Sequence, residues 1–335
     1  MGMWVVPSDL LARARFAISP KAEVAAALGA LLHPQDPTER AFAAAHADAF
    51  TEMLRAYPAR AAVLAASFRA RTADAPGWIA NYLATPPRGP RPGFDEELAI
   101  VRAMDDVALR QDLETTARRP LPALLDDVGV VRPAVELLDW LWTRTVASDW
   151  PRRRRVLEAD IVARTAQLAR RGWAGVVQGL GKHREWLADG RIRINRYDLP
   201  DRQLPSTAEL SFVPVLSAGS WVGWDGDGRH CIYYPVSGRL APSSGEEAGG
   251  LDALIGANRA LLLRLLDVPT TTSGLAAQTG LPLGSVGNHL AVLLRSGAVL
   301  RRRAGHSVLY WQSALGQGLV AADADRPASD SRAPR

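Results

Sequence analysis

The sequence contains a single cysteine, Cys231, among its 335 residues. One cysteine excludes an internal disulfide and every zinc site that needs several cysteines, and it is typical of proteins in a reducing cytoplasm. We therefore expect a cytoplasmic protein without a disulfide framework, and no motif in the sequence indicates a metal or a cofactor.

Long apolar runs are missing as well. The longest, residues 24 to 32, covers nine residues, whereas a membrane-spanning helix needs about 20. No basic segment precedes an apolar stretch at the N-terminus, which a secretory leader would require. We expect no membrane segment.

Intact enzyme motifs are also absent. Residues 175 to 182 resemble a phosphate-binding loop, but Val176 stands in place of the first glycine and His183 replaces the magnesium-binding Ser or Thr. We interpret this segment as a helix break. Asp225 and Asp227 suggest a calcium loop until Arg229 and His230 occupy positions that need other residues, so they predict a turn. The sequence does not indicate an enzyme.

What is present is a small basic region near the C-terminus. The chain has 40 basic and 35 acidic residues, a net charge of +5. Residues 251 to 320 hold six arginines against Asp252 and Asp267, so this stretch carries four of the five net charges. A nearly neutral large part joined to a small basic part indicates a module that binds a polyanion.

The fold class that we predict is mainly α, of mixed α+β type, in two or three domains. Helical patterns dominate up to about residue 187; for example, Asp36 and Pro37 indicate the start of a helix that continues to about Tyr57. Four prolines in residues 85 to 93 predict a loop and a possible hinge between helices. Alternating patterns predict strands in about 191–236, with a hairpin turn at residues 225 to 228.

These patterns divide the chain into four parts. We expect a helical effector or dimerisation domain at 1–240, a linker at 241–250, a small C-terminal domain at 251–321 and a disordered tail at 322–335.

The C-terminal domain has the pattern helix, turn, helix, hairpin. An amphipathic helix is predicted over 251–266, followed by a short helix that Thr272 caps and Gly280 ends. A second helix is predicted over 285–296, and residues 301 to 306 are expected at the tip of a basic hairpin. Two helices joined by a short turn and followed by such a hairpin are typical of a winged helix-turn-helix.

Residues 251 to 320 resemble the winged helix of the ArsR/SmtB-type bacterial transcription regulators. The residues that carry this resemblance are Ala257-Asn258-Arg259, Leu275-Ala276, the block from His289 to Leu293, Gly297-Ala298-Val299, and Arg303-Ala304-Gly305 before Tyr310. The resemblance implies a DNA-binding regulator, usually a repressor. The chain departs from the family at Gly287 and His306, and it lacks the Cys-x-Cys pair of the metal-sensing members.

The larger part resembles, more loosely, the domain that precedes the winged helix in long actinobacterial regulators of this type. Residues 16 to 20, 86 to 87 and 213 to 214 carry this second resemblance. It implies a role in dimerisation or in sensing a small-molecule effector whose identity the sequence does not disclose.

The expected partner is double-stranded DNA, bound by a homodimer, because one recognition helix reads only a few base pairs. We expect Ser285, Asn288 and His289 to face bases, although His289 could equally cap a local polar group. The remaining expected contacts, to phosphates or the minor groove, come from Thr271, Thr272, Arg301, Arg302, Arg303 and His306. The alternative is an enzyme or ligand-binding protein whose winged helix docks to another protein.

Three features of the larger part have two interpretations each. His46 lies between Phe42 and Phe50 on an apolar stripe and could line a pocket, but a hydrogen-bonded core histidine is the commoner case. Residues 152 to 155 are four arginines at a helix start, where Asp149, Glu158 and Asp160 could neutralise them at a solvated surface; an anion site or a second DNA contact is the other interpretation. Ten tryptophans could form an apolar effector pocket, or simply core.

Overall fold

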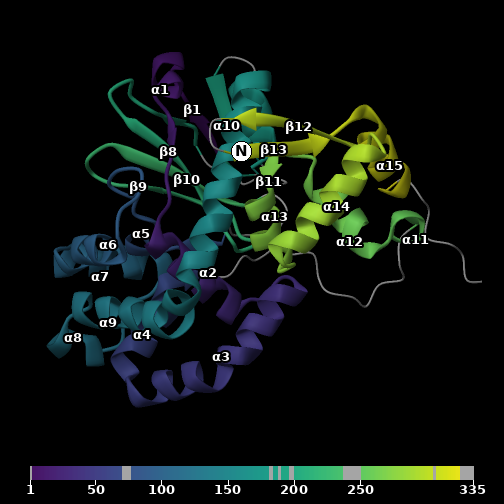
Figure 1. The fold of residues 1–335 in the computed structure, drawn as a ribbon. Helices are drawn as coiled ribbons and strands as arrows, with labels where there is room; N and C mark the ends of the chain where they lie inside the picture. The colour runs from purple at the N-terminus through teal and green to yellow at the C-terminus, as the bar shows by residue number, and fades with distance from the viewer. Residues whose placement is uncertain are drawn as a thin grey trace, which may run out of the picture. The chain divides into compact units, whose positions relative to one another are not determined.

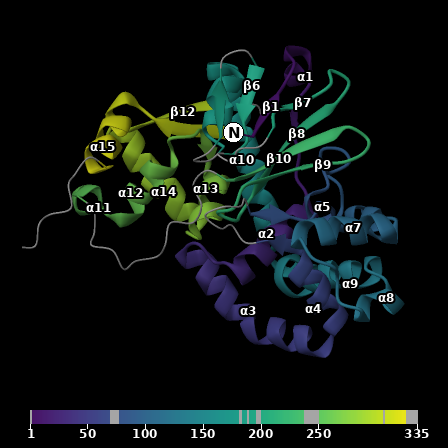
Figure 2. The same cartoon turned by 180° about the vertical axis from the view of Figure 1, so that it is seen from behind.

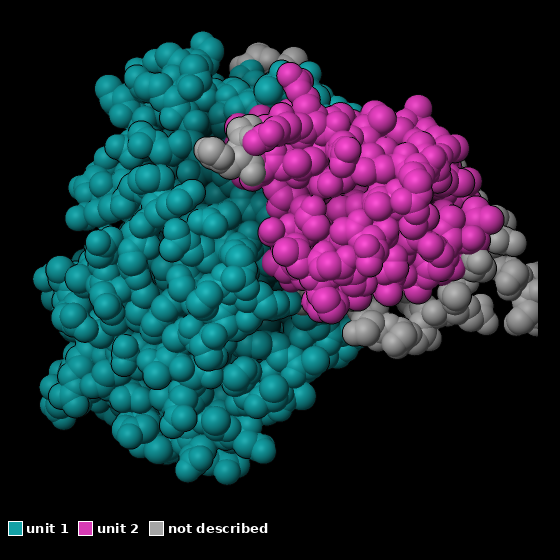
Figure 3. Space-filling view, in the orientation of Figure 1, with its two compact units in different colours: residues 1–161, 168–236 teal, residues 162–167, 237–335 magenta. Residues whose placement is uncertain are grey.

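The structure is a computed structural model that describes residues 2–69, 77–180, 184–187, 190–195, 200–236, 250–304 and 307–324. The fold is of mixed α+β class. The chain divides into two compact units, coloured separately in Figure 3: unit 1 comprises residues 1–161 and 168–236, and unit 2 comprises residues 162–167 and 237–335. The two units are described one after the other.

Unit 1 contains a layer of helices (Figures 1 and 2). These helices are α2 (Pro20–Leu32), α3 (Pro37–Ala56), α4 (Pro58–Ser67), α5 (Asn81–Ala84), α6 (Phe94–Arg102), α7 (Asp106–Ala117), α8 (Leu124–Val128) and α9 (Val131–Leu141). The start of α3 confirms the prediction, since the Asp36 side chain accepts a hydrogen bond from the backbone N of Glu39 at 2.8 Å. The predicted loop at residues 85 to 93 joins α5 to α6.

The core of this layer forms around α2. This helix is rich in alanine and is buried on nearly all sides, which is how a helix without a polar face packs. The helix itself contributes the fully buried Val24 and Leu28. Its neighbours supply further fully buried aliphatic side chains, which include Val63, Leu113, Leu137, Leu138 and Leu141.

A long irregular helical segment follows α9. A π-helix, η1 (Trp142–Val146), leads through a short 3₁₀ turn, η2 (Ala147–Asp149), into α10 (Trp150–Gln178). The helix break predicted at residues 175 to 182 agrees with the structure, because α10 ends at Gln178 within that segment. The helix α10 is also interrupted earlier, at Gly172, which adopts a positive φ of 64° that favours glycine.

Two sheets form the rest of unit 1, together with the short helix α1 (Ser8–Ala12). The first has the order β5 (Glu185–Leu187), β6 (Arg191–Arg193), β1 (Met3–Val5), β7 (Arg202–Gln203). The second has the order β2 (Arg15–Phe16), β8 (Glu209–Val215), β10 (Arg229–Pro235), β9 (Trp221–Trp224). A two-stranded sheet joins β3 (Phe68–Arg69) to β4 (Trp78–Ile79).

The predicted β segment is correct in part. The hairpin turn at residues 225 to 228 is confirmed, since β9 and β10 pair antiparallel across it. The boundary is wrong, because β1, β2 and β5 lie before residue 191 and complete the two sheets. Cys231 lies in β10 and is buried.

In the described part of the chain, unit 2 holds residues 162–167 of α10 and, from residue 250 onward, four helices, a short strand, a hairpin and a further helix. Its elements are α11 (Gly250–Ile255), α12 (Ala257–Leu265), β11 (Thr270–Thr271), α13 (Thr272–Thr279), α14 (Leu283–Arg295), β12 (Val299–Ala304), β13 (Ser307–Gln312) and α15 (Ala314–Ala324). The strands pair in the order β11, β13, β12 (Figure 1). The core consists of leucines from α12, α13 and α14, with Val286 and Val299.

The helices at the two ends of unit 2 differ from the sequence predictions. The helix predicted over 251–266 is two helices, because Gly256 adopts a φ of 84° between them. Gly250 belongs to α11 and not to the linker, whose other residues lie outside the described part. Residues 322 to 324 were assigned to a disordered tail but form the end of α15, where Asp323 lies 2.7 Å from Arg264 and accepts a hydrogen bond from the backbone N of Leu251.

Residues 325 to 335 of the expected tail lie outside the described residues. Among the described helices, none has both the length and the apolar character needed to cross a membrane.

Candidate nucleic-acid interface

The helices α13 and α14 of unit 2 are joined by a turn of three residues, 280 to 282. Gly280 ends α13 in the left-handed conformation with a φ of 72°, and its backbone N donates to the carbonyl oxygen of Ala276 at 3.0 Å. Pro282 then precedes α14 in extended conformation. The glycine and the proline together fix where the second helix begins.

The helix α14 has a buried and an accessible side. Val286, Leu290 and Leu293 are buried in the core of unit 2. Ser285, Asn288 and His289 are spaced i, i+3 and i+4, so they share a side of the helix. Asn288 is exposed, and Ser285 and His289 are half-buried. The start predicted at Ser285 is two residues late, because α14 begins at Leu283.

The threonine that caps α13 differs from the predicted one. The N-cap is Thr271 and not Thr272: the Thr271 hydroxyl accepts a hydrogen bond from the backbone N of Gly274 at 3.0 Å. The reason is that Thr271 also belongs to β11, whose extended conformation is the one that an N-cap requires. Thr272 is the first residue of the helix and is half-buried.

The three arginines of the hairpin lie within a strand. Arg301, Arg302 and Arg303 belong to β12 and pair with Tyr310, Leu309 and Val308 of β13, respectively. The prediction that they form the hairpin tip is therefore wrong. His306, the last of the predicted contacts, lies outside the described residues.

Strand geometry divides these arginines between two faces, because successive side chains of a strand point to opposite sides. Arg301 and Arg303 share a face with Tyr310, which packs against the core of unit 2. Arg302 belongs to the opposite face. All three arginines are exposed.

Ion pairs neutralise part of the positive charge of unit 2. Arg264 pairs with both Asp252 and Asp323. Within the described part of the chain, Arg301 and Arg302 have no carboxylate within ion-pair distance. The uncompensated charge of unit 2 therefore includes the hairpin strand.

Two glycines on α14 were not among the predicted site residues. A side-chain carbon built on Gly284 or Gly287 would have no neighbouring atom within 4 Å. Both positions are therefore open, and the backbone of the first half of α14 can be approached closely there. The sequence could have indicated this feature, since glycine is unfavourable within a helix unless its small size serves a purpose.

The predicted features of unit 1 have other outcomes. His46 packs against Phe42, with ring centroids 4.7 Å apart. The pKa of its imidazole is lowered mainly by partial burial and, to a lesser extent, by the positive charge of Arg153. Asp149 and Glu158 neutralise Arg152 and Arg154, as expected. Arg153 does not fit the expected solvated surface, because only 12% of its side chain is exposed and it lies 2.9 Å from the fully buried Glu23.

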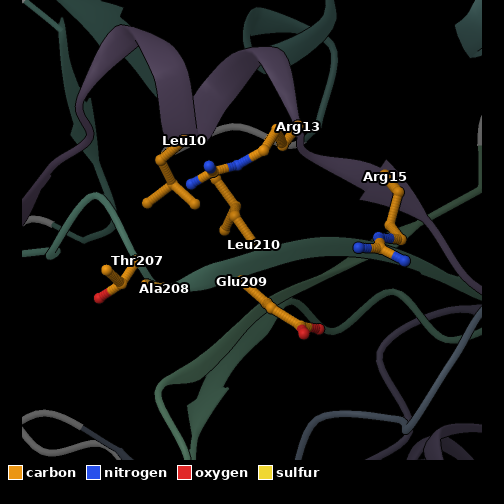
Figure 4. Close-up of a pocket in the computed structure, with 7 residues that line it drawn as sticks. All are labelled: Leu10, Arg13, Arg15, Thr207, Ala208, Glu209 and Leu210. Atoms are coloured by element: carbon orange, nitrogen blue, oxygen red, sulfur yellow. The ribbon is translucent and has the colours of Figure 1, made fainter.

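A groove of about 330 Å³ also lies in unit 1, between α1, β2 and β8 (Figure 4). Arg13 extends toward Leu10 and Leu210, and Arg15 and Glu209 contribute opposite charges. Arg13 is already held by a hydrogen bond to the carbonyl oxygen of Ser206. Because its charges are mixed, the groove does not define one class of ligand.

Comparison of the chain with models of protein families, with curated proteins and with solved structures finds no match. Among the described residues, no group of three or more His, Cys, Asp or Glu side chains could hold a metal ion.

Proposed function

We propose that unit 2 is a winged helix-turn-helix of the ArsR/SmtB type and that the protein is a sequence-specific DNA-binding transcription regulator of the cytoplasm, acting as a repressor. In this proposal α13 and α14 form the helix-turn-helix, and β12 with β13 forms the wing. The resemblance in sequence supports the family, and the order of elements in unit 2 agrees with it.

One observation carries the proposal: an exposed strand presents Arg301 and Arg302 without an internal ion pair among the described residues. Exposed arginines contribute little to folding when they lack a partner. They are well suited to phosphate oxygens, which guanidinium groups bind through several N–H donors.

The recognition contacts follow from α14. Asn288 is exposed and can form two hydrogen bonds with an adenine edge, while Ser285 and His289 lie on the same side of the helix. The Thr271 hydroxyl is occupied as a helix cap, so we assign phosphate contact in this region to Thr272 and to backbone N–H groups of the first turn.

A homodimer fits this role, because two recognition helices about 34 Å apart would enter successive major grooves of an inverted repeat. We assign dimerisation, effector sensing or both to unit 1. A regulator of this kind requires no catalytic activity.

The salt dependence of binding to DNA from upstream of the gene tests the proposal. Each phosphate neutralised contributes about 0.9 to the slope of log K against log salt concentration. Replacing Arg301, Arg302 and Arg303 together by alanine is expected to reduce the slope by about 2 to 3. The matched control is Arg295→Ala, an exposed arginine at the last turn of α14, which is expected to leave the slope unchanged.

The opposite results would contradict the proposal. A binding constant that does not vary with salt, or a triple variant that binds like the parent chain, would favour the reading in which unit 2 docks to a protein. A footprint on the upstream DNA then separates specific from non-specific binding, and Asn288→Ala is expected to lose the footprint while non-specific binding remains.

A further inference from the structure

A cavity with aromatic walls lies in unit 1, lined by residues of α6, of the π-helix η1 and of the first turns of α10. The rings of Phe94 and Trp142 stack with centroids 4.5 Å apart and an angle of 9° between their planes. Trp150 meets Trp142 edge to face at 5.5 Å. The buried Ile18 also lines the cavity. Such a surface favours a flat aromatic ligand, which can stack on one indole and meet the edge of the other.

The cavity has the size of a single ring. Its volume is about 180 Å³, slightly more than the roughly 150 Å³ of a protein cavity that holds benzene. A two-ring ligand with substituents would not be enclosed. The volume thus indicates one aromatic ring with one small substituent.

The charge at the cavity specifies the substituent. Arg91 and Arg154 both line it, and their side chains are 64% and 48% exposed. Both guanidinium groups lie near the same carboxylate oxygen of Glu158, at 3.6 Å and 3.0 Å. Two arginines share one carboxylate, so the three groups carry a net charge of +1, and most of the guanidinium N–H donors remain for a ligand.

The ion pairs with Glu158 do not prevent an anion from binding. Exposed ion pairs of this kind contribute little to stability, so a ligand carboxylate can replace one of them at little cost. Arginine binds carboxylates in a two-pronged geometry. The site is therefore complementary to a carboxylate attached to a flat ring.

The backbone at Trp142 points to the same place. Trp142 begins the π-helix η1. Leu141 precedes this segment and Val146 is its last residue, and both side chains are fully buried. Single π turns within helices are uncommon and frequently occur at functional sites. Trp142 remains half-buried beside the cavity.

We propose that this cavity binds a single-ring aromatic carboxylate, held against Trp142 and Trp150 in the cavity wall with its carboxylate on Arg91 and Arg154. That the ligand acts as an effector of DNA binding rests on the proposed function; the binding itself does not.

Benzoate is the probe, and its binding to the full-length chain is measured by ligand-observed NMR and calorimetry without DNA. We expect saturable binding. Benzamide, which has the same shape but no charge, is expected to bind about tenfold more weakly. No saturable binding of benzoate, or equal binding of the two compounds, would overturn the proposal.

Variants of exposed side chains locate the site without disturbing the core. Arg154→Met and Arg91→Met are each expected to weaken benzoate binding about tenfold, because a charge-assisted hydrogen bond is lost. Glu158→Gln is expected to strengthen binding severalfold, because it frees both guanidinium groups. Arg152→Met is the control: Arg152 lies two residues from Arg154 in the same helix and pairs with Asp149, but it does not line the cavity.

The direction of change at Glu158 separates a binding site from a structural ion-pair cluster. A cluster that merely supports the fold predicts that Glu158→Gln weakens or does not change benzoate binding, and that result would overturn the proposal. Trp142→Leu is expected to abolish saturable binding, with circular dichroism confirming that the variant is folded.

DNA binding is measured separately, with and without benzoate. If benzoate binds as described but the chain does not bind DNA, the cavity assignment stands and the regulator proposal fails. If the chain binds DNA but not benzoate, the reverse holds.

Discussion

Two glycines on α15 predict opposite effects of the same substitution. A side-chain carbon on Gly316 would lie 2.2 Å from the carbonyl oxygen of Ala298, at the start of the hairpin, whereas one on Gly318 would have no neighbour within 4 Å. Ordinary carbon–oxygen contacts are about 3.3 Å or longer. Helix or strand would thus have to move by about 1 Å in Gly316→Ala, because a backbone oxygen cannot rotate away.

The magnitudes follow from two opposing contributions. Alanine in place of glycine within a helix gains about 1 kcal/mol, while overpacking against a rigid neighbour costs about 1 to 3 kcal/mol or more. With the clash at the upper end of that range, Gly316→Ala is expected to destabilise unit 2 by about 2 kcal/mol. Gly318→Ala is expected to stabilise it by up to about 1 kcal/mol.

Hydrogen exchange and thermal unfolding measure the difference. For a unit of this size, 2 kcal/mol corresponds to roughly 8 to 16 °C in the midpoint. Faster exchange is expected in β12 and α15 of Gly316→Ala, and DNA binding should weaken with it because the strand that carries the arginines shifts. If the two alanine variants were equally stable, α15 would not pack against Ala298 and the reasoning would be refuted.

Three further predictions concern single side chains. Lys21→Met is expected to lower the free energy of unfolding by about 3 to 5 kcal/mol in urea, because the buried ammonium donates to the carbonyl oxygens of Tyr82, Leu83 and Thr85 and balances the charge of Glu97; wild-type stability would contradict this. Burial raises the pKa of Asp112 from 3.8 to about 6, so between these two pH values the folded chain binds a proton that the unfolded chain has released. The free energy of unfolding therefore falls as the pH rises through that window. Asp112→Asn should flatten this pH dependence, and a variant with the same dependence as the parent chain would count against the prediction. Gly287→Ala should raise the midpoint of unit 2 by a few degrees, since its side chain meets open space, and a lowered midpoint would mean that the space is filled.

The sequence predicted those helix ends and turns correctly whose conformation depends only on residues close by in the chain. The start of α3 is determined by Asp36 and Pro37, and the hairpin between β9 and β10 by Gly228, which adopts a φ of 80° in the turn. The glycine that ends α13 could be identified for the same reason. In each case the controlling contact spans only a few residues.

The features that the sequence did not predict depend on residues far apart in the chain. Strands β1 and β2 are three and two residues long, and each becomes a strand because residues near 192 and 212 pair with it. A window of that length carries no periodicity. The boundary of the β region was therefore placed too late.

Buried charges could not be predicted for the same reason. Lys21 and Glu23 would be expected on the solvated side of a helix, yet both are buried, because Tyr82 and Arg153 supply their partners from elements far along the chain. Nothing within α2 signals these partners. The cavity beside Trp142 also depends on elements that the sequence does not place together.

The hairpin arginines illustrate how far a composition argument reaches. A run of three arginines predicts a concentration of positive charge, and that charge is exposed in the structure. The sequence does not reveal that the three arginines pair with Tyr310, Leu309 and Val308 in a strand, so that their side chains point to alternate faces of the hairpin. A flat contact with one phosphate backbone would use one face, either Arg302 alone or the other two, whereas insertion of the hairpin into a groove would use both. Comparing the salt slope of Arg302→Ala with that of the Arg301→Ala/Arg303→Ala double variant therefore distinguishes these geometries: we expect both variants to lower the slope, as insertion into a groove requires, because all three arginines are exposed on the two faces of the strand.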